Sequence, residues 1–224
     1  MIQITQCEPR EIILTTSEIL RYLGYCHNTA DADTLSTIEG CLAEICHSFK
    51  PKACFDFFDI TRKPGGTLVT GFMSSRSKSL RKNLAGCEKV ILFAATLGID
   101  IDRILSKFSI TSLHDAIIVQ AIGAAAIEKW CDILCHTFGK TANEQGYFLR
   151  PRFSPGYGDF PLEIQKNIFD VLDCSRKIGL TLTDSLLMMP SKSVTAIIGL
   201  SRENTNCSPR GCEVCDKTDC NFRR

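Results

Sequence analysis

The longest apolar stretch of the chain, residues Ala116 to Ile127, constrains the fold most strongly. It is interrupted by Gln120 and ends at Glu128 and Lys129, so it is too short to cross a bilayer as a helix. A stretch of this kind is typical of a helix that is buried in a globular core. The surrounding segment, Leu113 to Phe138, is therefore predicted to form the most buried helix of the molecule.

The residues at the ends of this segment favour helix boundaries. Ser112 and Asp115 have the spacing of an N-terminal capping box, and Gly139 is typical of the residue that ends a helix. A later helix is predicted to begin at Asp159 or Phe160, with a proline in its first turn.

Further helices and strands are interspersed along the chain. Because several connections resemble hairpins rather than crossovers, the predicted fold is α+β. It has a mainly antiparallel sheet with flanking helices, plus a short cysteine-rich C-terminal tail. Helices are expected at Pro9 to Tyr22, Asp31 to Phe49, Ser77 to Cys87 and Asp100 to Phe108, and strands at Ala53 to Ile60, Thr67 to Phe72, Lys89 to Thr96 and Val194 to Leu200.

Composition limits the classes of partner and location. The chain has 224 residues, 44% of them hydrophobic, which is enough for one domain with or without an appendage. A formal net charge of +1 indicates neither a nucleic-acid partner nor an anionic membrane. No signal peptide is recognisable at the N-terminus, so a cytoplasmic location is expected. A basic face formed by Arg76, Lys78, Arg81 and Lys82 is either simply solvated or meets an acidic partner surface.

The segment from Arg150 to Pro161 carries the clearest functional signal. Three prolines and two glycines within it fix an irregular backbone. The same segment holds two guanidiniums, a phenol and a carboxylate, and such pre-organised groups bind a charged small molecule with little loss of entropy. A tight connection between a strand and a helix is the simpler interpretation of the glycines and prolines.

Three motifs add a family resemblance to this signal. Arg152 to Tyr157, followed by Pro161, is similar to the pattern R-x-x-P-G-Y-x-x-x-P. Ile178 to Ser185 resembles a "TG-aliphatic-x-LT-x-S" stretch, and Met189 to Val194 resembles a "P-x-x-S-V" approach to the last strand. On these motifs the chain resembles the activation domain of cobalamin-dependent methionine synthase, over roughly residues 85 to 201.

The resemblance implies a ligand, S-adenosylmethionine (AdoMet), and a set of residues that bind it. Arg152 matches the arginine that holds the methionine carboxylate, a task suited to two parallel charged hydrogen bonds. Ser154 matches a position whose backbone contacts the ligand, and Gly156 lies in the same loop. Tyr157 matches a tyrosine near the sulfonium end of AdoMet.

The resemblance also implies acidic groups that meet the positive charge of AdoMet, and these are expected at Glu128 and Glu144. The acid-containing N-terminal segment of the family has no clear match here. A curved sheet with AdoMet in its concavity is implied as well. No catalytic residue is expected, because the reduced cobalt is already a strong nucleophile and the protein must mainly supply positioning and exclusion of water.

The activity implied by the resemblance is the remethylation of cobalamin by AdoMet after the cofactor has been oxidised and reduced again. The chain has no D-x-H-x-x-G motif, so cobalamin is expected on a partner protein. That partner would be a cobalamin-dependent methionine synthase or another corrinoid protein, served by an electron donor. Two alternatives are an AdoMet-sensing regulatory module without chemistry and an electron-transfer or metal-binding protein that acts through its tail.

The C-terminal tail differs from the rest of the chain, because four cysteines appear where apolar residues become scarce. Residues 1–201 are therefore predicted as the AdoMet-binding domain and residues 202–224 as a metal-binding tail. Four thiolates suit tetrahedral zinc or an iron–sulfur cluster, and a cluster would help to deliver an electron. A tail with free or oxidised thiols is the simpler alternative. The predicted ligands are Cys207, Cys212, Cys215 and Cys220.

Overall fold

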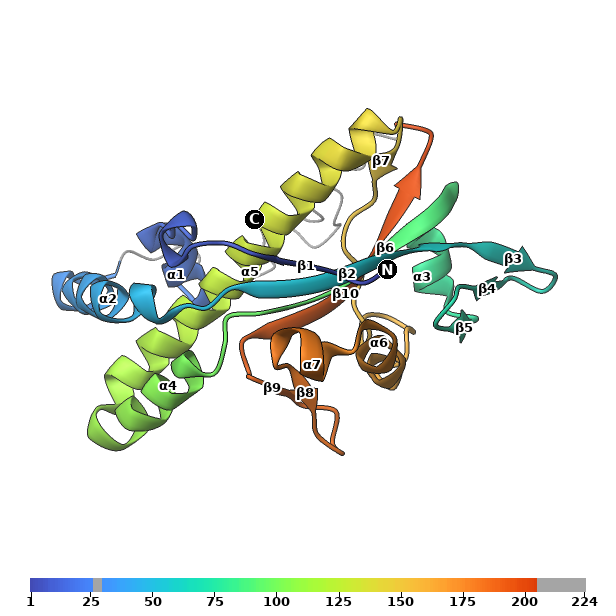
Figure 1. Ribbon diagram of the computed structural model, residues 1–224. Coiled ribbons are helices and arrows are strands. Elements are labelled where there is room, and N and C mark those ends of the chain that lie inside the picture. The colour runs from blue at the N-terminus through green and yellow to red at the C-terminus, as the bar shows by residue number, and fades with distance from the viewer. Residues whose placement is uncertain (26–29, 205–224) are drawn as a thin grey trace.

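A computed structural model describes residues 1–25 and 30–204 of the chain. Its centre is a five-stranded sheet in the order β1-β2-β6-β10-β7, in which every neighbouring pair is antiparallel (Figure 1). The strands are β1 (Gln3–Gln6), β2 (Lys52–Asp59), β6 (Cys87–Thr96), β10 (Ser193–Ser201) and β7 (Phe148–Leu149).

The central strand β6 is buried on both faces. Every residue from Val90 to Ala95 has no exposed surface, and the strand is paired on both sides. Its partners are residues 52–59 of β2 and residues 193–201 of β10. Burial on both faces explains why this strand appears in the sequence as a continuous apolar run instead of an alternating pattern.

Helices cover both faces of the sheet, and each layer has its own apolar cluster. The helix α5 crosses one face, with α1, α2 and α4 beside it, and α3, α6 and α7 pack on the opposite face (Figure 1). The helices are α1 (Thr16–Tyr22), α2 (Ala32–Ile45), α3 (Lys78–Asn83), α4 (Asp100–Thr111), α5 (Leu113–Glu144), α6 (Ile164–Leu172) and α7 (Cys174–Ile178).

The long helix α5 confirms the prediction of a buried helix but not its predicted end. The Ser112 hydroxyl accepts a hydrogen bond from the Asp115 backbone N–H at 3.3 Å and so caps the N-terminus. Gly139 does not end the helix, which continues to Glu144. Burial of Phe138 and Ala142 on either side of this glycine favours continuation and outweighs the cost of about 1 kcal/mol for glycine in a helix.

The N-terminal segment forms two short helices where the sequence predicted one. A 3-10 helix, Pro9–Glu11, is followed by α1, because Thr15 caps the latter in a reciprocal capping box with Glu18. A second 3-10 helix, Cys46–Ser48, follows α2.

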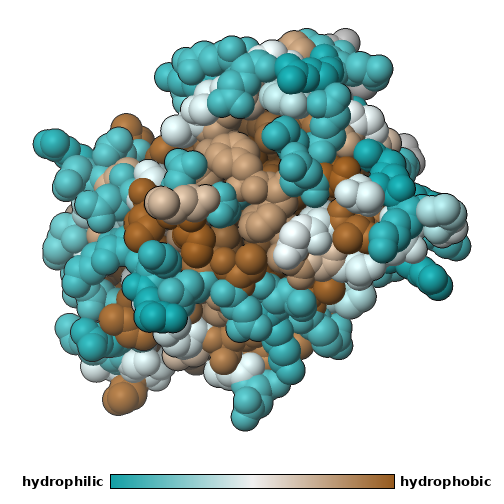
Figure 2. Space-filling view, turned by 45° about the vertical axis from the view of Figure 1, so that its right-hand side comes forward, coloured by the Kyte–Doolittle hydropathy of each residue, from teal (hydrophilic) through white to brown (hydrophobic). Residues whose placement is uncertain are grey.

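Two small sheets complete the fold. One contains β3 (Thr61–Lys63), β4 (Thr67–Val69) and β5 (Ser74–Ser75), and the other contains β8 (Thr181–Leu182) and β9 (Met188–Met189). On the face shown in Figure 2, apolar residues gather in the middle and polar residues surround them. The structure thus confirms an α+β fold with a curved, antiparallel sheet and flanking helices.

Candidate functional site

The segment that begins at Arg150 is held against the edge of the main sheet. The Arg150 N–H donates to the carbonyl of Gly199 at 2.8 Å, and Phe153 exchanges two backbone hydrogen bonds with Ile197, each of 2.9 Å. Side chains alternate along such an extended segment. Phe153 therefore packs into the cluster beneath α6, while Arg152 points towards α5 on the other face.

A tight turn follows, and its backbone is well constrained. Gly156 has a φ of +90°, a conformation that glycine adopts without strain. Its N–H donates to the Phe160 carbonyl at 2.8 Å, and the Phe160 N–H donates back to the Tyr157 carbonyl at 3.0 Å. Phe160 is 1% exposed and anchors the turn in the core. These contacts give the loop the rigidity that its glycines and prolines predict.

Asp159 fastens the same loop to α3. Its carboxylate accepts hydrogen bonds from the Ser77 hydroxyl at 2.6 Å and from the backbone N–H groups of Lys78 and Ser79 at 2.7 and 2.9 Å. These bonds, led by that of Ser77, hold the pKa of Asp159 well below its usual range. Asp159 therefore caps α3 and does not open the next helix, which begins only at Ile164.

Arg152 lies at the centre of a charged cluster with α5. Its Nη2 donates to Glu128 at 3.1 Å and to Asp132 at 2.8 Å. The two carboxylates are four residues apart and so share one face of the helix. The Arg152 side chain is 19% exposed, so its charge is partly shielded from water. One guanidinium between two carboxylates leaves the cluster with a formal charge of −1.

A cavity of about 490 Å³ lies beside this cluster. Such a volume falls within the usual range for small-molecule sites, about 300–1,000 Å³. One wall is a single face of α5, and the other is the extended segment that ends at Arg152. The lining residues are Asp132, Cys135, His136, Gly139, Lys140, Asn143, Leu149, Arg150, Pro151 and Arg152.

The structure brings together some of the predicted binding residues and leaves others apart. Glu128 forms an ion pair with Arg152. Glu144 is exposed at the C-terminal end of α5 and does not line the cavity. Ser154 and Tyr157 lie in the turn, where the tyrosine is 64% exposed and likewise outside the cavity lining.

Asp132 was not predicted, although it makes the shorter of the two ion pairs with Arg152. A signal for it exists in the sequence, because it stands one helical turn after Glu128. Two acidic residues at this spacing on a helix predicted to be buried would have indicated a common cationic partner.

The thiols near the charged cluster of Arg152 lie in apolar surroundings. Burial raises the pKa of Cys135 to about 11, and burial also raises the pKa of Cys131 above its usual range, so both thiols stay protonated at neutral pH. Within residues 1–25 and 30–204, no group of three or more histidine, cysteine or acidic side chains is arranged to hold a metal ion. The predicted metal ligands Cys207, Cys212, Cys215 and Cys220 lie outside the described residues.

Comparisons with known proteins found one matching family and a similar solved structure. Residues 79–207 match the model of the family described as "Vitamin B12 dependent methionine synthase, activation domain". The structure is similar to the MetH reactivation domain bound to AdoHcy, with a TM-score of 0.66 and 14% sequence identity. That similarity covers 89% of this chain and 78% of the other, and it supports the fold. In the part of the chain that is described, no helix has the length and apolar content needed to span a membrane.

Proposed function

Because this chain belongs to the activation-domain family of vitamin B12-dependent methionine synthases, we propose that it binds AdoMet and supports reductive methylation of cobalamin. The matched segment, residues 79–207, includes Arg152, Glu128 and the whole proline- and glycine-rich loop. The single observation that carries the proposal is the position of Arg152, paired with two carboxylates at the edge of a cavity of suitable size.

The charges around Arg152 complement the amino-acid end of AdoMet. Both of its ion pairs use Nη2, and within the described residues its Nε and Nη1 donate no hydrogen bond, so they can donate to a ligand carboxylate. Glu128 and Asp132 provide negative charge for the ammonium and sulfonium groups. Ser154, Gly156 and Tyr157 would contribute the loop side of the site. Glu144 is not among the residues that line the cavity, although its neighbour Asn143 on α5 is.

The proposed reaction has two steps, and cobalamin on the partner protein is its substrate. An electron donor reduces cob(II)alamin to cob(I)alamin by one electron. The cobalt then takes the methyl group of AdoMet, the carbon–sulfur bond breaks, and methylcobalamin and S-adenosylhomocysteine are formed. The contribution of this chain is to orient AdoMet and to exclude water, so no side chain needs to act as a general acid or base.

The partner proposed here is a cobalamin-dependent methionine synthase or another corrinoid protein, and the setting is cytoplasmic. Residues 1–201 would form the AdoMet-binding domain, in keeping with the end of β10 at Ser201. Residues 202–224 would form the metal-binding tail, with zinc or an iron–sulfur cluster held by its four cysteines.

Isothermal titration of the purified chain with AdoMet tests the binding proposal. We expect Arg152→Ala to weaken AdoMet binding about 30-fold or more, since losing one partner of a charged contact costs about 2–5 kcal/mol. Arg176→Ala is the matched control, because that arginine is exposed on α7 and pairs with Asp173, away from the cavity lining. If wild type and Arg152→Ala bind AdoMet with equal affinity, the proposed site is wrong.

A second assay separates chemistry from sensing. The chain, AdoMet, a reductant and a cob(II)alamin-loaded methionine synthase are combined, and methylcobalamin is followed by its visible absorption. We expect formation of methylcobalamin to depend on the chain and to be lost in Arg152→Ala. A chain that binds AdoMet but yields no methylcobalamin would be a sensor.

A further inference from the structure

The charge of this molecule is distributed unevenly. Residues 60–87 contain six cationic residues and no aspartate or glutamate. The whole chain has 26 cationic and 25 acidic residues, so the remainder holds 20 cationic and 25 acidic groups. A molecule that is nearly neutral overall therefore has one strongly basic segment. Its cationic residues are Arg62, Lys63, Arg76, Lys78, Arg81 and Lys82.

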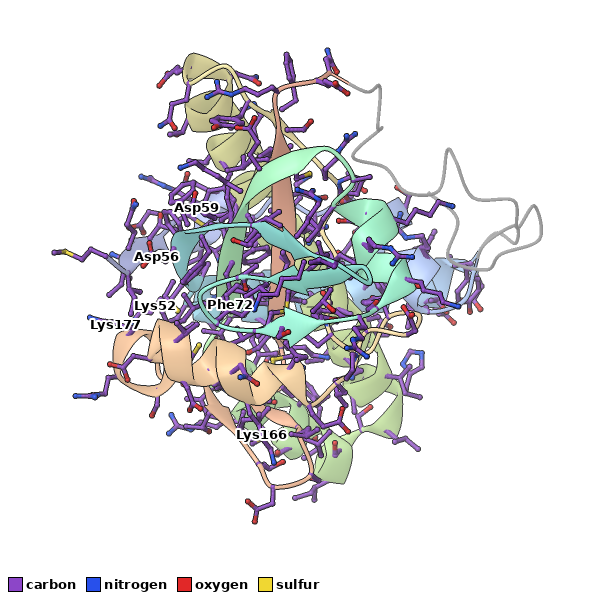
Figure 3. All side chains as sticks on the ribbon, turned by 90° about the vertical axis from the view of Figure 1, so that its right-hand side faces the viewer. Lys52, Asp56, Asp59, Phe72, Lys166 and Lys177 are labelled. Carbon is purple, nitrogen blue, oxygen red and sulfur yellow. The ribbon has the colours of Figure 1, made fainter. Side chains whose placement is uncertain are left out.

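These six residues, here called the basic surface, lie on β3, on α3 and directly after β5, and all are exposed. Figure 3 looks onto the β3-β4-β5 sheet with α3 at its side. Within the described part of the chain, none of the six forms an ion pair. Of the acidic neighbours, Asp59 pairs with Lys89 and Glu88 with Arg202. The Asp159 carboxylate lies at the start of α3, where it accepts hydrogen bonds from the Ser77 hydroxyl and two backbone N–H groups and forms no ion pair with the six cations.

Two arginines of the basic surface are held in place by contacts that do not neutralise them. Arg62 donates to the backbone carbonyls of Leu84 and Cys87 at 2.9 and 2.7 Å, which ties β3 to the end of α3. Arg81 lies so close to the β3–β4 turn that a Cβ at Gly66 would collide with its guanidinium. Cations fixed in this way lose little conformational entropy when a partner binds them.

We propose that the basic surface is the docking site for an acidic surface of a partner protein. Nucleic acid fits less well, because the segment presents no exposed aromatic side chain on which bases could stack. An anionic membrane fits less well too, since the apolar residues Leu68, Phe72 and Met73 are buried and leave nothing to insert. Carboxylates on a protein supply the missing counter-charges without either requirement.

The basic surface adjoins the loop of residues 150–161, here called the ligand loop. A partner docked on this surface would therefore lie next to the proposed AdoMet site. Asp159 caps α3 from that loop, and Gly158 lies against Ser79, so the loop is in direct contact with the helix that carries half of the basic surface. This step rests on the proposed function: the docked partner is the corrinoid-carrying protein, whose cobalt must approach the loop that contains Tyr157. Opposite charges would also speed the encounter, most strongly at low salt.

The test uses the intact chain and the cobalamin-dependent methionine synthase of the same organism. The variant Lys63→Glu/Lys82→Glu reverses charge on β3 and α3 at two exposed side chains. Its matched control, Lys166→Glu/Lys177→Glu, makes the same change in charge on α6 and α7, away from the basic surface (Figure 3). Thermal melting checks that all three proteins fold, and titration checks that all three bind AdoMet equally.

We expect the dissociation constant for the partner to rise at least 10-fold in Lys63→Glu/Lys82→Glu and to change less than 3-fold in the control. A zero-length carbodiimide cross-linker should join partner carboxylates to Lys63, Lys78 or Lys82. Equal affinities, cross-links that map only elsewhere, or no complex at all would overturn the docking site. So would tighter binding of a 20-bp DNA duplex or of phosphatidylserine vesicles than of the partner.

The proposed function and the proposed docking site can be refuted independently of each other. If Lys63→Glu/Lys82→Glu binds AdoMet, supports remethylation and binds the partner with unchanged affinity, the docking site is refuted and the proposed function is not. If the chain binds no AdoMet but is cross-linked to the partner at the basic surface, the proposed function is refuted and the docking site is not.

Discussion

At the scale of single residues, Asp159 joins two segments that are about 80 positions apart in the chain. Its carboxylate caps α3 and so fastens the loop of residues 150–161 to that helix, and its charge stabilises both. We expect Asp159→Asn, which keeps the shape but loses the charge, to lower the melting temperature at pH 7 by a few degrees.

The difference between wild type and Asp159→Asn should depend on pH. The folded protein holds the pKa of Asp159 below its value in the unfolded chain, so its stabilisation is fully present above the unfolded pKa, about 4. It is lost as the pH falls through the acid range towards the lowered folded pKa. The difference in melting temperature should therefore stay constant above the unfolded pKa and begin to shrink as the pH falls below about 4, and a difference independent of pH would contradict this role of the charge.

Single residues also show which parts of the site the sequence could predict. Arg152 and the loop were found because a motif and its spacing identify them. Glu128 was expected as an acidic group, whereas Asp132 was missed although its spacing from Glu128 is visible in the sequence. That spacing does not identify Arg152, 20 positions away on a different element, as the common partner.

At the scale of elements, two glycines within helices make a matched pair. Gly40 in α2 has nothing within 4 Å of a Cβ added to it, whereas a Cβ at Gly123 in α5 would lie 2.7 Å from Cε of Lys192. We expect Gly40→Ala to raise the free energy of unfolding by about 0.5–1 kcal/mol, the usual gain from replacing glycine in a helix. Gly123→Ala should lose that gain, because the buried stem of Lys192 must move.

Urea unfolding of both variants, of Lys192→Ala and of Gly123→Ala combined with Lys192→Ala measures this difference. A favourable coupling energy between positions 123 and 192 is expected, since the smaller side chain relieves the collision. If Gly123→Ala stabilises as much as Gly40→Ala, the stem of Lys192 does not lie across α5.

The elements themselves were predictable where one local signal dominates. Apolar runs placed the strands β2, β6 and β10 within two residues of their ends, and a serine placed the start of α5. The predictions failed where tertiary contacts decide. Gly139 lies inside α5 because residues on either side of it are buried, and Asp159 caps a helix far away in the sequence.

At the scale of the whole molecule, the sequence predicted a sheet with flanking helices but not which helix covers which face. A strand such as β6 is apolar at every inner position, so it has no alternation that distinguishes its two faces. Only the assembled structure shows α5 on one side and α6 with α7 on the other.

The last prediction concerns the boundary between the domain and the C-terminal tail, which lies just after the end of β10. Arg202, just after β10, lies 3.7 Å above the ring of Tyr147 and donates to the Gln145 carbonyl at 2.7 Å. The described fold is thus closed by residue 204, and the four predicted metal ligands come later in the sequence. A chain cut after Asn204 should melt at the temperature of the full chain and bind AdoMet with the same affinity.

The full chain, purified without oxygen, should carry zinc, or iron with sulfide, and the shortened chain should carry none. Cys212→Ser serves as the control that keeps the tail but removes one thiolate, and it should also lose most of the metal, because a tetrahedral site needs all four ligands. Elemental analysis and visible absorption distinguish zinc from a cluster. A shortened chain that keeps the metal, or melts well below the full chain, would show that the tail and the domain are not independent, since two units without shared contacts contribute separately to stability.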